Sequence, residues 1–188
     1  MVLILGPWNY PFQLLFSPLV AALAAGNCVC LKPSELAPEV SKVMRAIVDE
    51  AFEPGHVTLI EGDAEVARRL VGLDFDHIFL TGSAEVGRQV MRAAAANLTP
   101  VTLELGGKCP CVVASDARLD VAARRIAWGK FLNAGQTCVA PDHVFVHLSL
   151  QQRFLEAMKA TLLEFFGDDP RQSSDFGRIL NLTQFERI

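Results

Sequence analysis

The sequence predicts an α/β protein: a doubly wound, mostly parallel sheet of the Rossmann-like type, followed by part of a second α/β unit. Short apolar runs of strand length alternate with helical stretches through residues 2–105. The same alternation restarts after Gly106-Gly107. We therefore expect one domain over residues 1–106 and a partial second domain over residues 107–188.

Five strands are expected in the first domain, as continuous apolar runs buried on both faces, at residues 2–5, 28–31, 57–60, 78–80 and 101–105. Four helices are expected between them, at residues 12–25, 38–52, 64–71 and 84–96. Because parallel strands need crossover connections, these helices should cover both faces of the sheet. A ligand would then bind at the carboxyl ends of the strands.

The second domain is expected to contain strands at residues 111–114 and 144–147 and helices at residues 119–133 and 150–165, with a helix-like segment at residues 180–188. The chain begins inside a strand and stops within that helix-like segment without a cap. We therefore expect it to be cut from something longer.

Charge and cysteine content narrow the class of partner. Lys plus Arg number 17 and Asp plus Glu 21, a formal net charge of −4, which argues against nucleic acid or a polybasic membrane surface and favours a small molecule. The 5 cysteines, an odd number, favour reduced thiols in the cytoplasm. The first 31 residues lack Asp, Glu, Lys, Arg and His, but glycine, proline and asparagine interrupt them too often for a signal peptide or a membrane span.

Two candidate binding segments follow the first two expected strands. Trp8 and Asn9 lie between prolines, which is also typical of a rigid turn whose Asn caps the next helix. Lys32 and Glu35 place a cation beside an anion, which is also typical of a solvated turn.

A third segment, residues 81–87, places a glycine pair across a strand-to-helix turn, where backbone N–H groups and the helix dipole can hold a phosphate. Arg88 and Gln89 stand where a P-loop has Lys and then Ser or Thr, and the G-x-G-x-x-G fingerprint is absent. By itself this turn is a weak signal.

Glu104 and Cys138 are the candidates for chemistry. Glu104 stands between leucines at the end of an expected buried strand, where desolvation makes a carboxylate a candidate general base, the alternative being an ion pair. Cys138 follows a Gly-Gln-Thr turn that can expose a nucleophile. The other cysteines form Cys-x-Cys pairs in apolar strands, where we expect burial rather than a metal site. The 4 histidines are expected in loops or at the surface.

Together these segments resemble the aldehyde dehydrogenase family, in its class-three branch. The resemblance rests on Gly-Pro-Trp-Asn-Tyr-Pro, Thr-Pro-Val-Thr-Leu-Glu-Leu-Gly-Gly-Lys and Asn-Ala-Gly-Gln-Thr-Cys-Val-Ala-Pro-Asp, and it covers essentially the whole chain. It implies helices ahead of the first strand and a Glu-x-Phe-Gly-Pro segment beyond residue 188. Cys109 departs from the family, which commonly has a small polar residue there.

The resemblance implies NAD(P)-dependent oxidation of an aldehyde to a carboxylic acid. Cys138 would be the nucleophile, giving a thiohemiacetal and then a thioester. The Asn9 amide and the Cys138 backbone N–H would hold the oxyanion, and Glu104 would activate the hydrolytic water.

The cofactor-binding residues that the resemblance implies are Trp8, Lys32, Glu35, Gly82, Ser83, Val86, Gly87, Leu105 and Gly106. Glu35 favours NAD because it repels a ribose 2′-phosphate, whereas the adjacent Lys32 leaves NADP open. No metal is implied.

The class-three branch further implies a medium-chain, long-chain or aromatic aldehyde and a homodimer of the full-length protein. A membrane anchor beyond residue 188 stays open. Two alternatives remain: a truncated, non-catalytic fragment that binds a partner subunit, and a thiol esterase or acyltransferase that uses Cys138 without redox chemistry.

Overall fold

The computed structural model describes residues 1–187. The chain divides into two compact units, Met1–Gly106 and Gly107–Ile188. Each unit has its own strands, helices and hydrophobic core, and each is described by itself.

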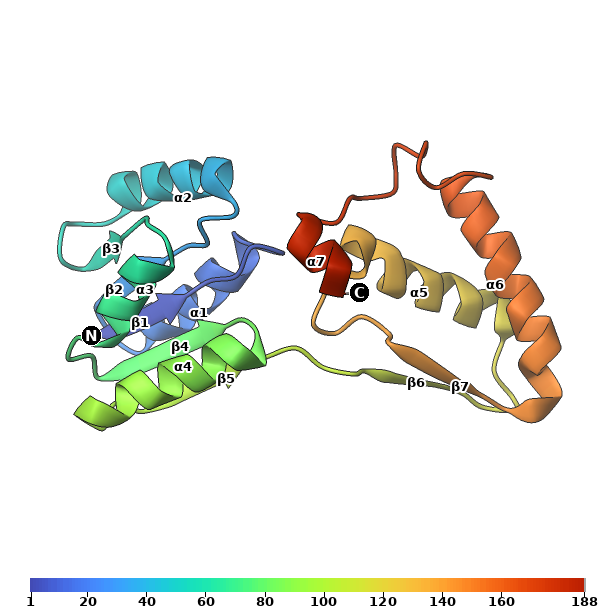
Figure 1. Ribbon diagram of the computed structural model, residues 1–188, viewed down its shortest axis with the longest axis horizontal. Helices are drawn as coiled ribbons and strands as arrows, with labels where there is room; N and C mark the ends of the chain where they lie inside the picture. Colours follow the sequence, from blue (N-terminus) through green and yellow to red (C-terminus); the bar gives the residue numbers. More distant parts are fainter. Residues whose placement is uncertain (188) are drawn as a thin grey trace. The chain divides into compact units, whose positions relative to one another are not determined.

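The first unit is built on a five-stranded sheet in which every neighbouring pair is parallel (Figure 1). Its strands are β1 (Val2–Leu5), β2 (Val29–Lys32), β3 (Val57–Leu59), β4 (His77–Thr81) and β5 (Val101–Glu104). Their order is β3-β2-β1-β4-β5. The chain runs outward from β1 on one side and then returns to β4 on the other. This arrangement confirms the predicted doubly wound parallel sheet.

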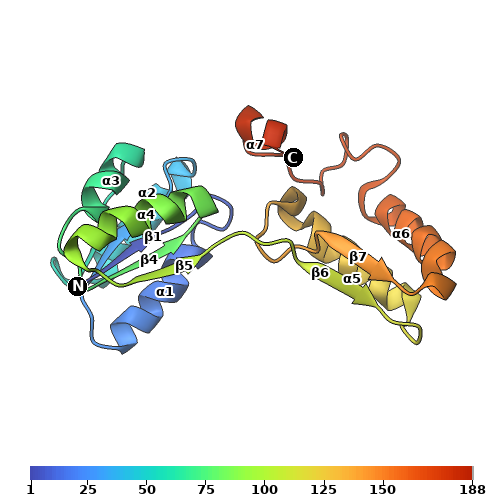
Figure 2. The ribbon, with the colours of Figure 1, turned by 60° about the horizontal axis from the view of Figure 1, so that its bottom comes forward.

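Four helices cover the sheet: α1 (Gln13–Ala24), α2 (Pro38–Ala51), α3 (Ala64–Val71) and α4 (Ala84–Ala94), the last followed by a short 3-10 turn, Ala95–Asn97. Alternate residues of β1 point to opposite faces. Val2 and Ile4 pack in one core with residues of α1 and α2, whereas Leu3 and Leu5 pack in another with residues of α3 and α4. Figure 2 shows α1 and α4 on opposite sides of the sheet. The prediction of helices on both faces is thus confirmed.

The second unit contains a two-stranded parallel sheet, β6 (Pro110–Val113) and β7 (His143–Val146). Helix α5 (Leu119–Phe131) and a 3-10 turn, Leu132–Gly135, connect the two strands. A second 3-10 turn, Leu148–Leu150, leads into α6 (Gln151–Phe166), and α7 (Leu182–Arg187) follows. The core of this unit is formed by Val113, Ile126, Leu150 and Phe154. Ile188, the last residue of the expected helix-like segment, lies outside the described residues.

Several expectations about cysteine burial were wrong. Cys28 is exposed and Cys109 is half-buried, because each precedes its strand instead of lying within it, and Cys111 is half-buried although it lies within β6. Cys30 is buried in β2, and this burial raises the pKa of its thiol to about 11. Within residues 1–187, no helix combines the length and the apolar character needed to cross a bilayer.

Candidate functional site

The carboxyl ends of the central strands lie together at one edge of the first unit's sheet. Leu5 at the end of β1 is in register with Lys32 of β2 and with Leu80 of β4. Backbone bonds extend this pairing, since Gly6 N–H donates to Lys32 C=O (3.0 Å) and Gly82 N–H donates to Glu104 C=O (2.9 Å). The segments after β1, β2, β4 and β5 therefore start from fixed positions at the edge where parallel α/β sheets bind ligands.

Asn9 follows β1 in a turn ahead of α1. The expectation that its side chain caps this helix was wrong, because Phe12 occupies the N-cap position and makes no side-chain capping bond. The turn is instead supported by backbone bonds from Leu14 N–H to Tyr10 C=O (3.0 Å) and from Phe16 N–H to Phe12 C=O (2.9 Å). Trp8 and Asn9 are both half-buried.

Lys32 does not lie in a solvated turn. It is the last residue of β2, between β1 and β3, and only 4% of its surface is exposed. Its Nζ lies 3.0 Å from Glu35 Oε2, and the Glu35 side chain is partly exposed. A buried ammonium needs such a partner, because desolvation of an unpaired charge is costly. The strand order thus turns an ordinary Lys-x-x-Glu spacing into a half-buried ion pair.

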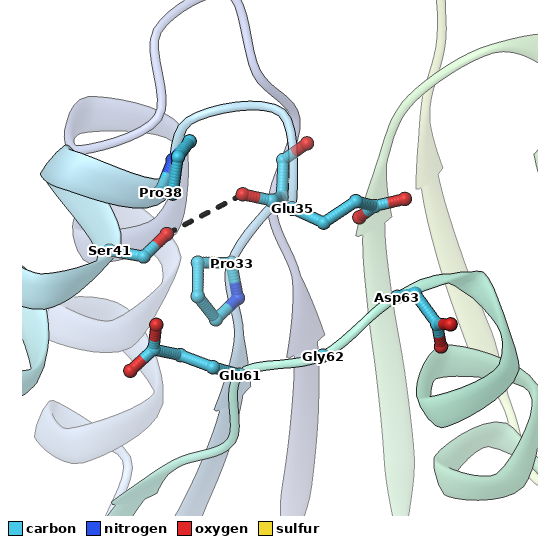
Figure 3. A pocket seen from close by; sticks show the side chains of 8 residues that line it. Pro33, Glu35, Pro38, Ser41, Glu61, Gly62 and Asp63 are labelled. Carbon is cyan, nitrogen blue, oxygen red and sulfur yellow. Dashed lines mark hydrogen bonds between the residues drawn. The ribbon is translucent and has the colours of Figure 1, made fainter.

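A pocket opens beside this ion pair, between the segments that follow β2 and β3 (Figure 3). It is lined by Pro33, Ser34, Glu35, Pro38, Ser41, Glu61, Gly62 and Asp63. Ser41 Oγ donates to the backbone C=O of Ser34 (3.4 Å) and of Ala37 (3.0 Å), which fixes the start of α2 against the loop. Three carboxylates, those of Glu35, Glu61 and Asp63, give the lining a negative character.

Sequence reasoning missed the side of this pocket that follows β3. Asp63 caps α3 by accepting bonds from Val66 N–H (3.2 Å) and Glu65 N–H (3.0 Å), and these bonds lower the pKa of its carboxyl. Gly62 has a φ of +151°, and a Cβ there would lie 2.5 Å from Val66 Cγ2. A Gly-Asp pair directly ahead of a helical pattern is a signal that could have drawn attention to this position.

The glycine turn after β4 begins α4. Ser83 is the N-cap residue, and its Oγ accepts a bond from Val86 N–H (3.2 Å). Gly87 is buried, and a Cβ there would lie 3.1 Å from Leu105 Cδ2. Gly82 is less constrained, with a Cβ 3.4 Å from Leu80 Cδ1. Gly87 thus lets the first turns of α4 approach β5 closely, and α4 begins just after the carboxyl end of β4.

Glu104 is exposed, so the expectation of a desolvated carboxylate was wrong. The reason lies in the strand order, because β5 is an outer strand of the sheet and has a neighbour only on the β4 side. Leu105 is half-buried and Gly106, the last residue of the first unit, is exposed. Glu104 therefore ends β5 as a carboxylate accessible to water.

Cys138 follows an unusual turn in the second unit. Helix α5 ends at Phe131, earlier than the predicted residue 133, because the backbone turns left-handed at Asn133 (φ 52°), Ala134 (φ 54°) and Gly135 (φ 78°). A non-glycine residue in this region costs about 1–3 kcal/mol and persists only where surrounding bonds enforce it.

The side chain of Gln136 supplies those bonds. Only 8% of its surface is exposed. Its Nε2 donates to the C=O of Asn133 (3.0 Å) and of Arg178 (3.0 Å), and its Oε1 accepts from Leu180 N–H (3.0 Å). Gln136 thus ties the strained turn to the segment ahead of α7, and Cys138 lies two residues beyond this anchor.

The surroundings of Cys138 include a second thiol. Cys138 is half-buried, and its C=O accepts a bond from Cys109 Sγ (3.3 Å). Asp142 N–H donates to Cys109 C=O (2.9 Å), so the two segments run alongside each other into β6 and β7. Lys108 Nζ lies 3.3 Å from the Asp142 carboxylate, and this bond lowers the pKa of that carboxyl. Nothing in the sequence pattern signalled this contact.

Two of the histidines have different surroundings. His143 is exposed beside Asp142 (3.6 Å), whereas His77 lies within β4 and bonds Thr102 Oγ1 (2.9 Å). Across residues 1–187, no group of three or more His, Cys, Asp or Glu side chains is arranged to hold a metal ion.

The model of the aldehyde dehydrogenase family matches residues 1–188, and the chain belongs to this family.

Named relatives show where in the family the chain falls. It is 50% identical over 187 residues to 4,4'-diaponeurosporen-aldehyde dehydrogenase of Staphylococcus aureus, which covers 100% of this chain and 41% of the relative. It is 49% identical to the dimeric NADP-preferring aldehyde dehydrogenase of Mus musculus and 48% identical to aldehyde dehydrogenase family 3 member A2 of Macaca fascicularis, covering 41% and 39% of their lengths. The class-three resemblance is thereby confirmed.

Solved structures agree. The substrate-bound state of Staphylococcus aureus AldH superimposes with a TM-score of 0.91 at 49% identity, over 99% of this chain and 41% of that one. Lactaldehyde dehydrogenase from Escherichia coli gives a TM-score of 0.89 at 34% identity, over 99% of this chain and 40% of that one. The chain thus spans about two fifths of the length of its relatives.

Proposed function

We propose that the protein containing this chain oxidises an aldehyde to a carboxylic acid with NAD or NADP, residues 1–106 binding the nucleotide and residues 107–188 carrying the nucleophile. The observation that supports this most strongly is the Gln136-anchored turn ahead of Cys138. A strained turn held by buried hydrogen bonds is typical of a position that must be fixed for chemistry. Cys138 is the thiol that this turn presents.

Cys138 acts as the nucleophile. Its thiolate attacks the aldehyde carbon, a C–S bond forms, and the carbonyl oxygen becomes an oxyanion. The side-chain amide of Asn9 and the backbone N–H of Cys138 donate hydrogen bonds to this oxyanion. Such donors stabilise charge that develops only during the reaction. The chemistry supplied by a nicotinamide cofactor, when one is bound, is acceptance of a hydride from the substrate carbon.

Glu104 acts after oxidation, when the acyl group is held on Cys138 as a thioester. Its carboxylate accepts a proton from water, and the hydroxide equivalent attacks the thioester carbon and releases the acid and the thiol. The exposure of Glu104 at the end of β5 supports this role, because the base must reach water. A carboxylate held in an ion pair would be a weaker base, because a nearby cation favours its charged form.

The first unit has the features that a dinucleotide needs. The pocket beside Lys32 and Glu35 suits the adenosine end, and the amino end of α4 at Gly82 suits the pyrophosphate. The other proposed contacts are Trp8, Ser83, Val86, Gly87, Leu105 and Gly106. NAD is favoured because Glu35, Glu61 and Asp63 all repel a ribose 2′-phosphate. NADP stays open, since Lys32 is adjacent and one relative is named NADP-preferring.

The remaining proposals concern partners and location. We propose a medium-chain, long-chain or aromatic aldehyde as substrate, a view favoured by a relative named for diaponeurosporen-aldehyde. A homodimer is favoured by the relatives named as dimeric. The cytoplasm is proposed because all five cysteines are free thiols.

The proposed chemistry is tested with Cys138→Ser and Glu104→Gln, and with Cys28→Ser as a matched control from outside the site. NADH formation from an aromatic and a long-chain aldehyde is followed by absorbance. We expect Cys138→Ser to abolish it, Cys28→Ser to leave it unchanged, and Glu104→Gln to give one early burst followed by slow turnover, because acylation still occurs.

Two results would contradict the assignment. Full activity of Cys138→Ser would exclude it as the nucleophile, and a normal steady-state rate of Glu104→Gln would exclude the base. Hydrolysis of an ester without any nucleotide, in a protein that forms no NADH, would instead favour the thiol esterase alternative.

A further inference from the structure

The two parallel strands of the second unit bring two cysteines together. Pro110 at the start of β6 pairs with His143 at the start of β7. The residues just ahead of these strands remain joined, because Asp142 N–H donates to Cys109 C=O (2.9 Å). From this position Cys109 Sγ reaches the C=O of Cys138 at 3.3 Å.

We propose that Cys109 is a resolving thiol, which forms a reversible disulfide with Cys138 when Cys138 is oxidised by a hydroperoxide. The part of the test that measures enzyme activity rests on the proposed function, whereas detection of the disulfide does not. The bond itself depends on the positions of the two thiols.

The hydrogen bond between the two residues places the Cys109 sulfur close to the Cys138 backbone. A carbonyl oxygen lies about 2.4 Å from the Cα of its own residue, so Cys138 Cα lies within about 6 Å of Cys109 Sγ. Formation of a disulfide, in which the two sulfurs lie about 2 Å apart, then requires the two side chains to turn toward each other. Both cysteines are half-buried, so neither is sealed from solvent, and the segment between Cys138 and β7 contains no regular element that must be broken.

Cys111 provides a contrast within the same strand. It lies two residues beyond Cys109, inside β6, and it packs against the core formed by Val113, Ile126, Leu150 and Phe154. Its thiol belongs to that core, whereas the thiol of Cys109 bonds to Cys138. The structure therefore distinguishes two cysteines that the sequence places in one Cys-x-Cys motif.

The chemistry balances with the hydroperoxide as the only oxidant. The Cys138 thiolate attacks the peroxide oxygen and takes up one OH, which yields a sulfenic acid while the peroxide is reduced to an alcohol or to water. The Cys109 sulfur then attacks the sulfenic sulfur, and the S–S bond forms as water leaves. A dithiol donor reverses the bond. Without Cys109, the sulfenic acid proceeds to the sulfinic acid, which thiols do not reduce.

The test uses the purified protein treated with hydrogen peroxide and digested with trypsin under non-reducing conditions. Cleavage after Lys108 and Arg118 gives a peptide that contains both Cys109 and Cys111, and cleavage after Lys130 and Arg153 gives one that contains Cys138 as its single cysteine. We expect these two peptides to be joined, with the mass lowered by about 2 Da relative to their sum. Cys111→Ser is the matched control and should keep the cross-link, whereas Cys109→Ser should lose it.

A second readout follows the fate of Cys138. Aldehyde oxidation lost to peroxide should return on addition of dithiothreitol in the parent protein and in Cys111→Ser. In Cys109→Ser the initial activity should be retained, but the loss should be permanent and Cys138 should carry two extra oxygens.

Absence of the joined peptide in the parent protein, or its persistence in Cys109→Ser, would overturn the proposal. If the cross-link forms in a protein that has no dehydrogenase activity, the proposal for Cys109 and Cys138 stands and the proposed function is refuted instead.

Discussion

Replacing Gln136 should loosen the turn that presents Cys138. Gln136→Met keeps about the same volume but removes the side-chain hydrogen bonds to Asn133 C=O, Arg178 C=O and Leu180 N–H. Each such bond contributes about 1 kcal/mol net, and backbone groups left unpaired in a buried site cost more. Relaxation of the left-handed turn returns part of this loss. We therefore expect the free energy of unfolding of the second unit to fall by about 2–3 kcal/mol.

The two tryptophans allow this unit to be followed separately, because Trp8 lies in the first unit and Trp128 in the second. Urea unfolding is monitored by Trp128 fluorescence in a Trp8→Phe background. Gln152→Met is the matched control, since Gln152 is exposed on α6 and its side chain donates across the helix surface to Glu156 (2.9 Å). That exposed pair should contribute no more than about 0.5 kcal/mol.

The same variant should also slow catalysis. A turn that no longer fixes Cys138 should lower kcat more than it raises KM, because substrate binding does not depend on the exact position of the thiol. If Gln136→Met destabilises the second unit no more than Gln152→Met does, the side-chain bonds do not hold the turn and the reasoning is refuted.

Two further predictions concern charge. Glu35→Gln removes one carboxylate from the nucleotide pocket and frees Lys32, so NADP should bind about fivefold more tightly relative to NAD, as measured by calorimetry; an unchanged ratio would remove Glu35 as a selectivity determinant. Burial raises the pKa of the Cys30 thiol to about 11, so the folded state favours the neutral thiol. The stability that this preference contributes is fully present below the unfolded pKa of about 8.5, and it is lost as the pH rises towards 11. At pH 9, iodoacetamide should therefore label exposed Cys28 well before Cys30, and equal rates would contradict the burial.

The sequence was sufficient to predict the helices and strands of the first unit, but not which strands lie next to one another in the sheet. Apolar runs and helical periodicity located the five strands and four helices of the first unit, and α3 was predicted with its observed bounds. Lys32 and Glu104 were both misjudged, because each depends on strand order. Lys32 ends β2, which has a neighbouring strand on both sides, whereas Glu104 ends β5, which is an outer strand. Strand order is a tertiary property that residue patterns do not carry.

The candidate site was only partly predictable for a related reason. Motifs identified the residues that follow the strands, but the anchoring of the Cys138 turn depends on contacts over long sequence separations, such as Gln136 with Leu180. Ala134 gives no local signal of a left-handed backbone, since that conformation is imposed on it. The contact between Cys109 and Cys138 arises from the pairing of β6 with β7, which joins segments about thirty residues apart.

The strained turn also leaves room to raise the thermal stability of this chain. Glycine adopts a left-handed backbone at little cost, so a selection for thermal resistance alone would accept glycine at Ala134. We expect such a gain to come with a looser thiol, because glycine allows the backbone of the turn more conformations. Laboratory evolution for melting temperature alone should therefore select glycine at residue 134, in variants that turn over slowly. Laboratory evolution for turnover should keep alanine there.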